Sequence, residues 1–181
     1  MATLEGELRE HAERLVARYP QPRSALLPLL YLVQAEEGYV TRDGMREVAE
    51  LLSLSTAEVE AVATYYTMFK KAPTGRWLVS VCTNLSCALA GGRRLYERGV
   101  EGLGDGEAVA VEEVECLGAC DAAPVVQVNY CNYDRVSDQG FRELLERLRA
   151  DDPPDSSRGP KPDPHDVTAR RLAGLSEEGR G

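Results

Sequence analysis

The chain has 181 residues, of which 43% are hydrophobic and 28% charged, a balance typical of a globular protein with one modest domain or two small ones. Its 30 acidic and 21 basic residues leave a formal net charge of −9, and such a surface disfavours nucleic-acid binding because it repels phosphate backbones. No apolar run approaches the ~20 residues of a membrane span, and the first residues lack the basic and apolar regions of a signal peptide. We therefore expect a cytoplasmic protein without direct membrane insertion.

Helical patterns dominate the first part of the chain. Apolar residues recur at three- and four-residue steps, which predicts short amphipathic helices near residues 4–16, 23–37, 43–52 and 55–66. Gly38 is expected to end the second of these helices, and Ser55-Thr56-Ala57-Glu58 has the spacing of a capping box at the start of the fourth. The sequence thus predicts an N-terminal helical bundle over residues 1–72.

Strand patterns begin after Pro73-Thr74-Gly75. Strands are predicted at 77–81, from 108–111 through Val114-Glu115 to Cys116, at 125–128 and, more weakly, at 130–136, and the last two could pair as a hairpin. Helices are predicted at 88–97 and 141–148, with a glycine-rich turn at 99–106. The order is β-α-β-β-β-α, with a crossover helix after the first strand, and this order suggests a thioredoxin-like α/β layer over residues 73–150. The fold class is therefore α+β, with a helical bundle followed by an α/β domain.

The last segment, residues 151–181, has a different composition. Residues 151–164 are almost all Pro, Asp, Ser, Gly and charged residues, which predicts disorder in isolation, and residues 166–175 have the pattern of a short helix. We expect a flexible tail that serves as a partner-docking segment.

Four of the five cysteines form two close pairs, Cys82-Thr-Asn-Leu-Ser-Cys87 and Cys116-Leu-Gly-Ala-Cys120. Each pair follows a predicted strand, and parallel neighbouring strands would bring both loops to one edge of the sheet. Four thiolates could then converge, which is the ligand set of a tetrahedral zinc site or of an iron–sulfur cluster.

The spacing of the pairs bears on this choice. The gaps of four and three residues are looser than the CxxC knuckles of zinc ribbons, and they suit two irons that each take two thiolates. A thioredoxin-like dithiol is disfavoured because neither pair is CxxC. The remaining Cys131 is interpreted as a small packed hydrophobe, and His11 and His165 as structural or solvated. With no nucleotide loop, general base or substrate motif in view, we expect no catalytic residues and an electron relay.

The cysteine motifs resemble those of the E-type subunit family of NADH-quinone oxidoreductase, the 24 kDa-type subunit of respiratory complex I. The resemblance rests on Val81-Cys82-Thr83-Asn84-Leu85-Ser86-Cys87, Glu115-Cys116-Leu117-Gly118-Ala119-Cys120, Ala123-Pro124-Val125 and the segment from Val62 to Phe69. It covers about residues 10–150, and the segment from Asn129 to Tyr133 departs from the forms expected.

The resemblance implies a helical N-terminal bundle joined to a thioredoxin-like [2Fe–2S] ferredoxin domain, with Cys82, Cys87, Cys116 and Cys120 as ligands of one cluster. It implies a non-catalytic electron-transfer subunit of NADH:quinone oxidoreductase that exchanges single electrons with FMN. FMN and NADH would be bound by a partner subunit, and the large iron–sulfur subunit would be a second partner. The implied location is the peripheral arm of a membrane-bound complex, on the cytoplasmic face of the inner membrane.

Other functions share these motifs. Equivalent subunits serve NAD-reducing hydrogenases and NAD-dependent formate dehydrogenases, and a free-standing ferredoxin would carry the same cluster. A zinc-stabilised interaction module is the alternative from a different class, because it would use the same thiolates without redox chemistry.

Overall fold

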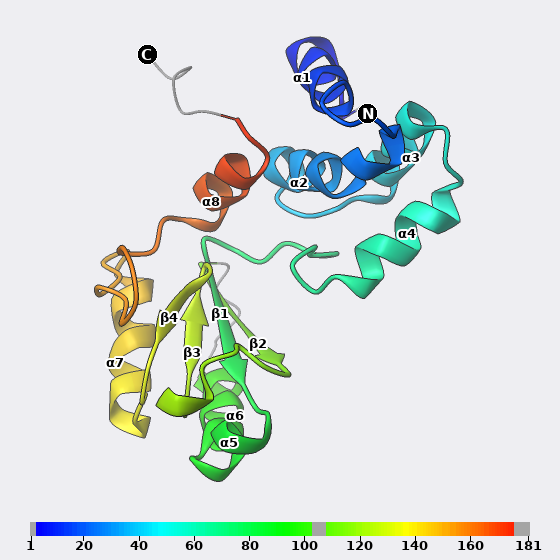
Figure 1. Ribbon diagram of the computed structural model, residues 1–181. Coiled ribbons are helices and arrows are strands. Elements are labelled where there is room, and N and C mark those ends of the chain that lie inside the picture. Colours follow the sequence, from blue (N-terminus) through cyan, green and yellow to red (C-terminus); the bar gives the residue numbers. More distant parts are fainter. Residues whose placement is uncertain (1–2, 103–107, 176–181) are drawn as a thin grey trace. The chain divides into compact units, whose positions relative to one another are not determined.

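The computed structural model describes residues 3–102 and 108–175, and the chain divides into two compact units (Figure 1). The helical unit is formed by residues 1–73 together with 166–181, and the sheet unit by residues 74–165. No helix in the described ranges is long and apolar enough to cross a membrane.

The helical unit contains the predicted N-terminal helices. They are α1 (Gly6–Val16), the 3₁₀ turn η1 (Pro22–Ala25), α2 (Leu26–Glu37), α3 (Arg42–Leu52) and α4 (Thr56–Tyr65). Gly38 ends α2 with a φ of 80°, a left-handed conformation that glycine adopts without steric cost. The predicted capping box is confirmed, because the side chain of Ser55 accepts from the backbone N–H of Glu58 and the Glu58 carboxylate accepts from that of Ser55.

The core of the helical unit lies around α2, whose residues Leu29, Leu30, Leu32 and Val33 are fully buried. The buried side chain of Gln34 fixes the segment after α4: its amide donates to a backbone carbonyl at 3.2 Å and its oxygen accepts from the N–H of Lys70 at 2.6 Å. A buried amide satisfied on both sides holds this segment in one conformation.

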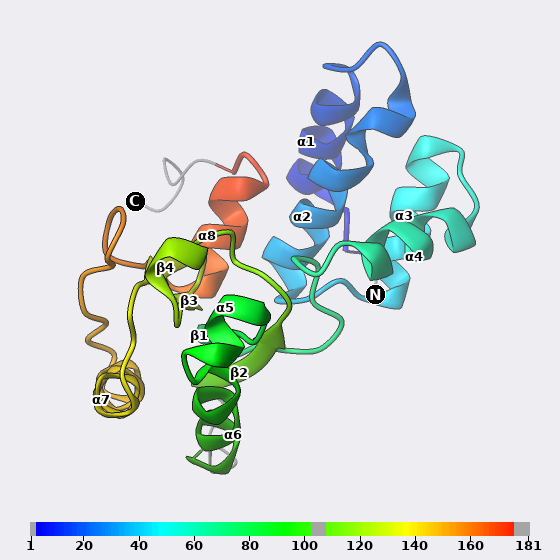
Figure 2. The same cartoon turned by 60° about the horizontal axis from the view of Figure 1, so that its bottom comes forward.

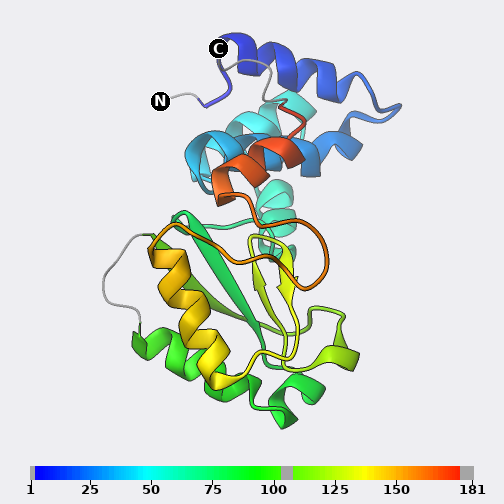
Figure 3. The same ribbon diagram turned by 90° about the vertical axis from the view of Figure 1, so that its left-hand side faces the viewer.

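In the described part of the sheet unit, four strands form one sheet in the order β2-β1-β3-β4. The strands are β1 (Trp77–Cys82), β2 (Val109–Val114), β3 (Val126–Val128) and β4 (Cys131–Tyr133). The pair β1–β2 is parallel, whereas β3 runs antiparallel to both β1 and β4. Helix α7 (Asp138–Arg149) lies across one face of the sheet, where Phe141 and Leu144 pack with the valines of β1 (Figure 3). The α+β fold and the β3–β4 hairpin are thus confirmed.

The crossover after β1 differs from the single helix predicted over residues 88–97. It consists of α5 (Leu85–Leu89) and α6 (Gly92–Gly102), which are separated at Gly91, where φ is 100°. Two consecutive glycines interrupt the helix because they favour non-helical backbone at little steric cost. Helix α6 also extends into the predicted glycine-rich turn, and the rest of that turn, residues 103–106, lies outside the described residues.

The segment after α7 also differs from the flexible tail that its composition predicts. Residues 151–165, here called the strap, lie on the sheet unit: the hydroxyl of Tyr133 donates to the carbonyl of Pro154 at 2.7 Å, and the Asn129 amide donates to that of Asp163 at 2.9 Å. These partners are side chains distant in sequence, which composition alone does not reveal. The strap leads into α8 (His165–Leu172), and Ala169 and Ala173 are buried in the core of the helical unit.

Candidate metal centre

The two cysteine loops begin at the same edge of the sheet. Cys82 is the last residue of β1 and is the register partner of Val114, the last residue of β2, and Cys116 follows two residues later. The N–H of Thr83 donates to the carbonyl of Val114 at 3.1 Å and continues the pairing past the strand ends. The prediction that parallel strands bring both loops to one edge is therefore confirmed.

The second cysteine of the first pair lies on α5, directly after β1 (Figure 2). Asn84 caps this short helix, since its side-chain oxygen accepts from the N–H of Leu85 at 2.6 Å. Cys87 faces inward and is buried. Strand, cap and helix together set the relative positions of Cys82 and Cys87.

Gly92 is a site residue that the sequence patterns do not single out. A Cβ atom at this position would collide with the carbonyl oxygen of Cys82 and would lie 2.9 Å from that of Cys87. Both obstacles are backbone atoms, so they cannot rotate away. A glycine is therefore required for α6 to start so close to both cysteines, and the Gly91-Gly92 pair soon after Cys87 is the signal that could have revealed it.

The two cysteine pairs differ in exposure. Cys82 and Cys87 are only 4% and 3% exposed and pack in a small apolar cluster with Ala119, Ala122 and Val125, whereas Cys116 and Cys120 are exposed. Ala119 precedes Cys120, so the second loop contributes to the cluster that surrounds the first pair. The site therefore has a dry side and a side open to solvent.

Burial governs the ionisation of the inner cysteines. It raises the pKa of Cys87 to about 11, and the neighbouring thiols of Cys82 and Cys120 raise that pKa as well. A thiol with this pKa is protonated near neutral pH and must release its proton on binding a metal.

Hydrogen bonds also reach the sulfurs and the carboxylates beside them. The N–H of Gly118 donates to Sγ of Cys116 at 3.3 Å, and Sγ of Cys82 donates to the carbonyl of Glu115 at 3.6 Å. Glu113 accepts from the hydroxyl of Thr83 at 2.6 Å, which fixes one carboxylate near the first loop. The Gly118 bond is compatible with a metal-bound thiolate and would offset its charge, whereas the Cys82 bond ends when that thiol releases its proton to a metal.

The remaining candidates lie elsewhere. Cys131 is partly exposed and pairs with Val128 in the β3–β4 hairpin. His11 contacts the carbonyl of Ala173 in the helical unit, and Nδ1 of the buried His165 lies 3.3 Å from the hydroxyl of Thr74. Within residues 3–102 and 108–175, no three cysteine, histidine or acidic side chains are gathered closely enough to hold a metal ion. The donor set itself, two thiols from each of two loops, has the soft ligand chemistry of zinc or iron–sulfur sites.

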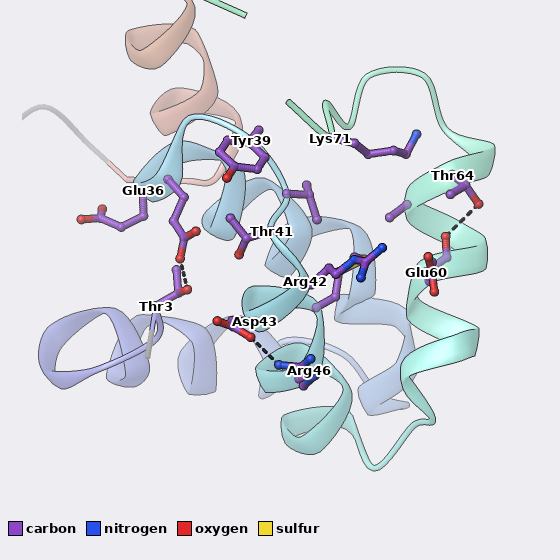
Figure 4. A pocket seen from close by; sticks show the side chains of 14 residues that line it. Thr3, Glu36, Tyr39, Thr41, Arg42, Asp43, Arg46, Glu60, Thr64 and Lys71 are labelled. Atoms are coloured by element: carbon purple, nitrogen blue, oxygen red, sulfur yellow. Dashed lines mark hydrogen bonds and ion pairs between the residues drawn. The ribbon is translucent and has the colours of Figure 1, made fainter. Parts of the chain in front are cut away.

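A cavity of about 1040 Å³ opens in the helical unit, beside α3 and α4 (Figure 4). The residues that line it carry both signs of charge, and two of these residues, Arg46 and Asp43, form an ion pair. The lining residues that the structure describes include neither cysteine nor histidine. The described lining therefore offers neither a thiolate nor an imidazole ligand.

Comparison with known proteins identifies relatives of the chain. The family model described as "Thioredoxin-like [2Fe-2S] ferredoxin" matches residues 12–149. The chain is 44% identical over 180 residues to the E-type NADH-quinone oxidoreductase subunit of Mycobacterium tuberculosis, in a match that covers 96% of this chain and 71% of that protein. It is 40% identical over 148 residues to NADH-quinone oxidoreductase subunit 2 of Thermus thermophilus, covering 76% of this chain and 82% of the relative.

A solved structure shares the fold. The crystal structure of an NAD⁺-reducing [NiFe]-hydrogenase in the H₂-reduced state matches with a TM-score of 0.52 and 21% identity, over 60% of this chain and 20% of that chain. The match thus spans about a fifth of the hydrogenase chain and shows a similarity of fold alone.

Proposed function

Because the chain belongs to the thioredoxin-like [2Fe–2S] ferredoxin family, we propose that Cys82, Cys87, Cys116 and Cys120 bind one [2Fe–2S] cluster. Within that family it is an E-type subunit of NADH-quinone oxidoreductase, complex I, with an electron-transfer role. The 44% identity to the mycobacterial subunit favours this complex over NAD-reducing hydrogenases, to which the likeness is one of fold.

The observation that carries the ligand assignment is that both cysteine loops begin at one sheet edge, with one pair buried and the other exposed. Four thiolates in two pairs fit the two irons of a [2Fe–2S] cluster. When bound, that cluster supplies reversible one-electron transfer. Cys82 and Cys87 exclude water from the inner side, and the N–H of Gly118 offsets negative charge on the sulfur of Cys116.

The exposed pair suggests how the protein works in its complex. Cys116 and Cys120 lie at the surface, so a partner that docks over them would bring its own redox group close to the cluster. We propose that this partner is the subunit that binds FMN and NADH, with which single electrons are exchanged, and that the large iron–sulfur subunit is the other neighbour. The chain would then act in the peripheral arm on the cytoplasmic face of the membrane, without a complete active site of its own.

The cluster is tested on the anaerobically purified chain by EPR after dithionite reduction, with iron, sulfide and zinc analysis. A rhombic spin-one-half signal with about two irons and two sulfides per chain supports the proposal. A colourless, EPR-silent protein that holds zinc and resists iron reconstitution would identify a zinc-stabilised module and overturn it.

A further inference from the structure

The strap places the positively charged side chain of Arg158 beside the loop that follows Cys120. Nε of Arg158 lies 2.7 Å from a carboxylate oxygen of Asp134, and its Nη2 lies 3.2 Å from one of Asp121. Asp121 is the next residue after Cys120, so one guanidinium group joins the strap, the end of β4 and the second cysteine loop.

Backbone pairing holds Arg158 in this position. The N–H of Ser157 donates to the carbonyl of Asn132 at 2.8 Å, and Arg158 forms an isolated antiparallel bridge with Asn132. The hydroxyl of Ser157 accepts from the N–H of Asp134 at 2.9 Å. The backbone that carries the Arg158 side chain is therefore held in place. This reduces the conformational entropy that is lost when the guanidinium forms its ion pairs.

Asp134 is the less exposed of the two acidic partners. Its side chain is 13% exposed, whereas that of Asp121 is 73% exposed. Its Oδ1 is buried and has no hydrogen-bond partner among the described residues, so Arg158 supplies the countercharge for this carboxylate. An ion pair with one shielded partner is screened less by salt than a fully exposed pair.

The residues after Asp134 support the loop of Cys120 directly. The N–H of Arg135 donates to the carbonyl of Ala122 at 2.9 Å, and its guanidinium donates to the carbonyl of Asp121 at 3.3 Å. The N–H of Val136 donates to the carbonyl of Pro124 at 3.0 Å. The segment that Arg158 fixes is thus hydrogen-bonded along the loop that follows Cys120.

We infer that Arg158 is a positioning residue of the metal centre, which holds the Cys120 loop through Asp121 and Asp134 and offsets their negative charge beside the cluster. This inference rests on the proposed function. With Arg158 present, the group of three side chains carries a net charge of −1; without it, two carboxylates are left near a centre that becomes more negative on reduction. Loss of Arg158 therefore disfavours the reduced state and loosens one ligand loop.

The test compares Arg158→Gln with Arg142→Gln, a matched control on the exposed side of α7 that removes the same charge. We expect Arg158→Gln to lower the midpoint potential of the cluster and to release iron to a chelator about two- to five-fold faster, the range for a partly exposed ion pair. Arg158→Lys should return the potential toward the wild-type value, because it restores the charge, and should release iron faster than wild type, because it lacks the planar fork. Arg142→Gln should leave both properties unchanged.

Two outcomes overturn the inference and differ in what they imply. If wild type gives the [2Fe–2S] signal and Arg158→Gln matches Arg142→Gln in potential and iron release, the positioning role is wrong and the proposed function stands. If wild type holds no [2Fe–2S] cluster, both fail. Should Arg158→Gln not fold, the double variant Asp134→Asn with Arg158→Gln replaces it, because no shielded carboxylate is then left without its countercharge. This variant keeps the net charge of −1, so we expect an unchanged potential and faster iron release, and iron release at the wild-type rate overturns the positioning role.

Discussion

Cys82 and Val114 are register partners in the parallel pair β1–β2, and each is the last residue of its strand. The distance between the starts of the two cysteine loops is therefore set by the spacing of hydrogen-bonded strands. The sheet thus sets where both loops begin. The hydrophobic core that stabilises the sheet therefore also stabilises the position of the two cysteine loops.

The ligand assignment predicts different outcomes for two cysteine variants. Cys116→Ser removes one of the four thiolates proposed to bind iron, and we expect the protein to lose most of its visible absorbance and iron content. Cys131→Ser changes a residue of the β3–β4 hairpin and should retain both. The measurement is the visible spectrum with iron per chain, and an equal loss in both variants would contradict the assignment.

Gly92→Ala tests the close approach of α6 to the cysteines. The added methyl group would meet the carbonyl oxygens of Cys82 and Cys87, and we expect a loss of about 1–3 kcal/mol in the free energy of unfolding, together with a lower cluster content. Gly102→Ala is the control in the same helix, since a Cβ there meets nothing within 4 Å. Thermal unfolding and iron analysis check both variants. Equal stability and equal iron content in the two variants would show that the contact of residue 92 with the cysteine backbone does not require a glycine.

Tyr133 should make the stability of the strap depend on pH. Burial holds its pKa above the ordinary value of 10.0, so the folded protein favours the neutral phenol that donates to Pro154. Its stabilising contribution is fully present below pH 10 and is lost as the pH rises above that value.

Tyr133→Phe removes this hydrogen bond and should cost about 1 kcal/mol at neutral pH. The difference in unfolding temperature between wild type and Tyr133→Phe should shrink as the pH rises above 10. A difference that stays constant from pH 8 to pH 11 would show that this phenol does not couple to folding.

Two truncations separate the roles of the C-terminal segment. A chain that ends at His165 keeps the strap but lacks Ala169 and Ala173, and we expect lower stability of the helical unit with an unchanged cluster potential. A chain that ends at Ala150 also lacks the strap, and we expect a lower potential and weaker binding to the FMN-binding subunit. Calorimetry with that subunit measures the binding, and equal dissociation constants for wild type and the shorter chain would exclude docking by this segment.

Much of the fold follows from the sequence because local rules decide it. Gly38 ends α2, Ser55 and Glu58 cap α4, and a short run rich in strand-forming residues marks β1. The start of both cysteine loops at one sheet edge also follows, because parallel strands place their ends at one edge.

What the sequence does not reveal depends on contacts between distant residues. The strap has the composition of a disordered segment, yet Asn129 and Tyr133 hold its backbone across more than twenty positions in the chain. The role of Gly92 likewise depends on the backbone of Cys82, which reaches it only after the chain has turned through α5. Sequence patterns and residue propensities describe residues that are close in the chain, whereas these contacts join residues that are far apart in it.

The return of the last helix to the helical unit has a consequence for biosynthesis. That unit is made from two separate stretches of the chain, and Ala169 and Ala173 complete its core. A ribosome finishes the sheet unit, with all four paired cysteines, before it makes these residues. The four paired cysteines are therefore synthesised before the residues that complete the core of the helical unit.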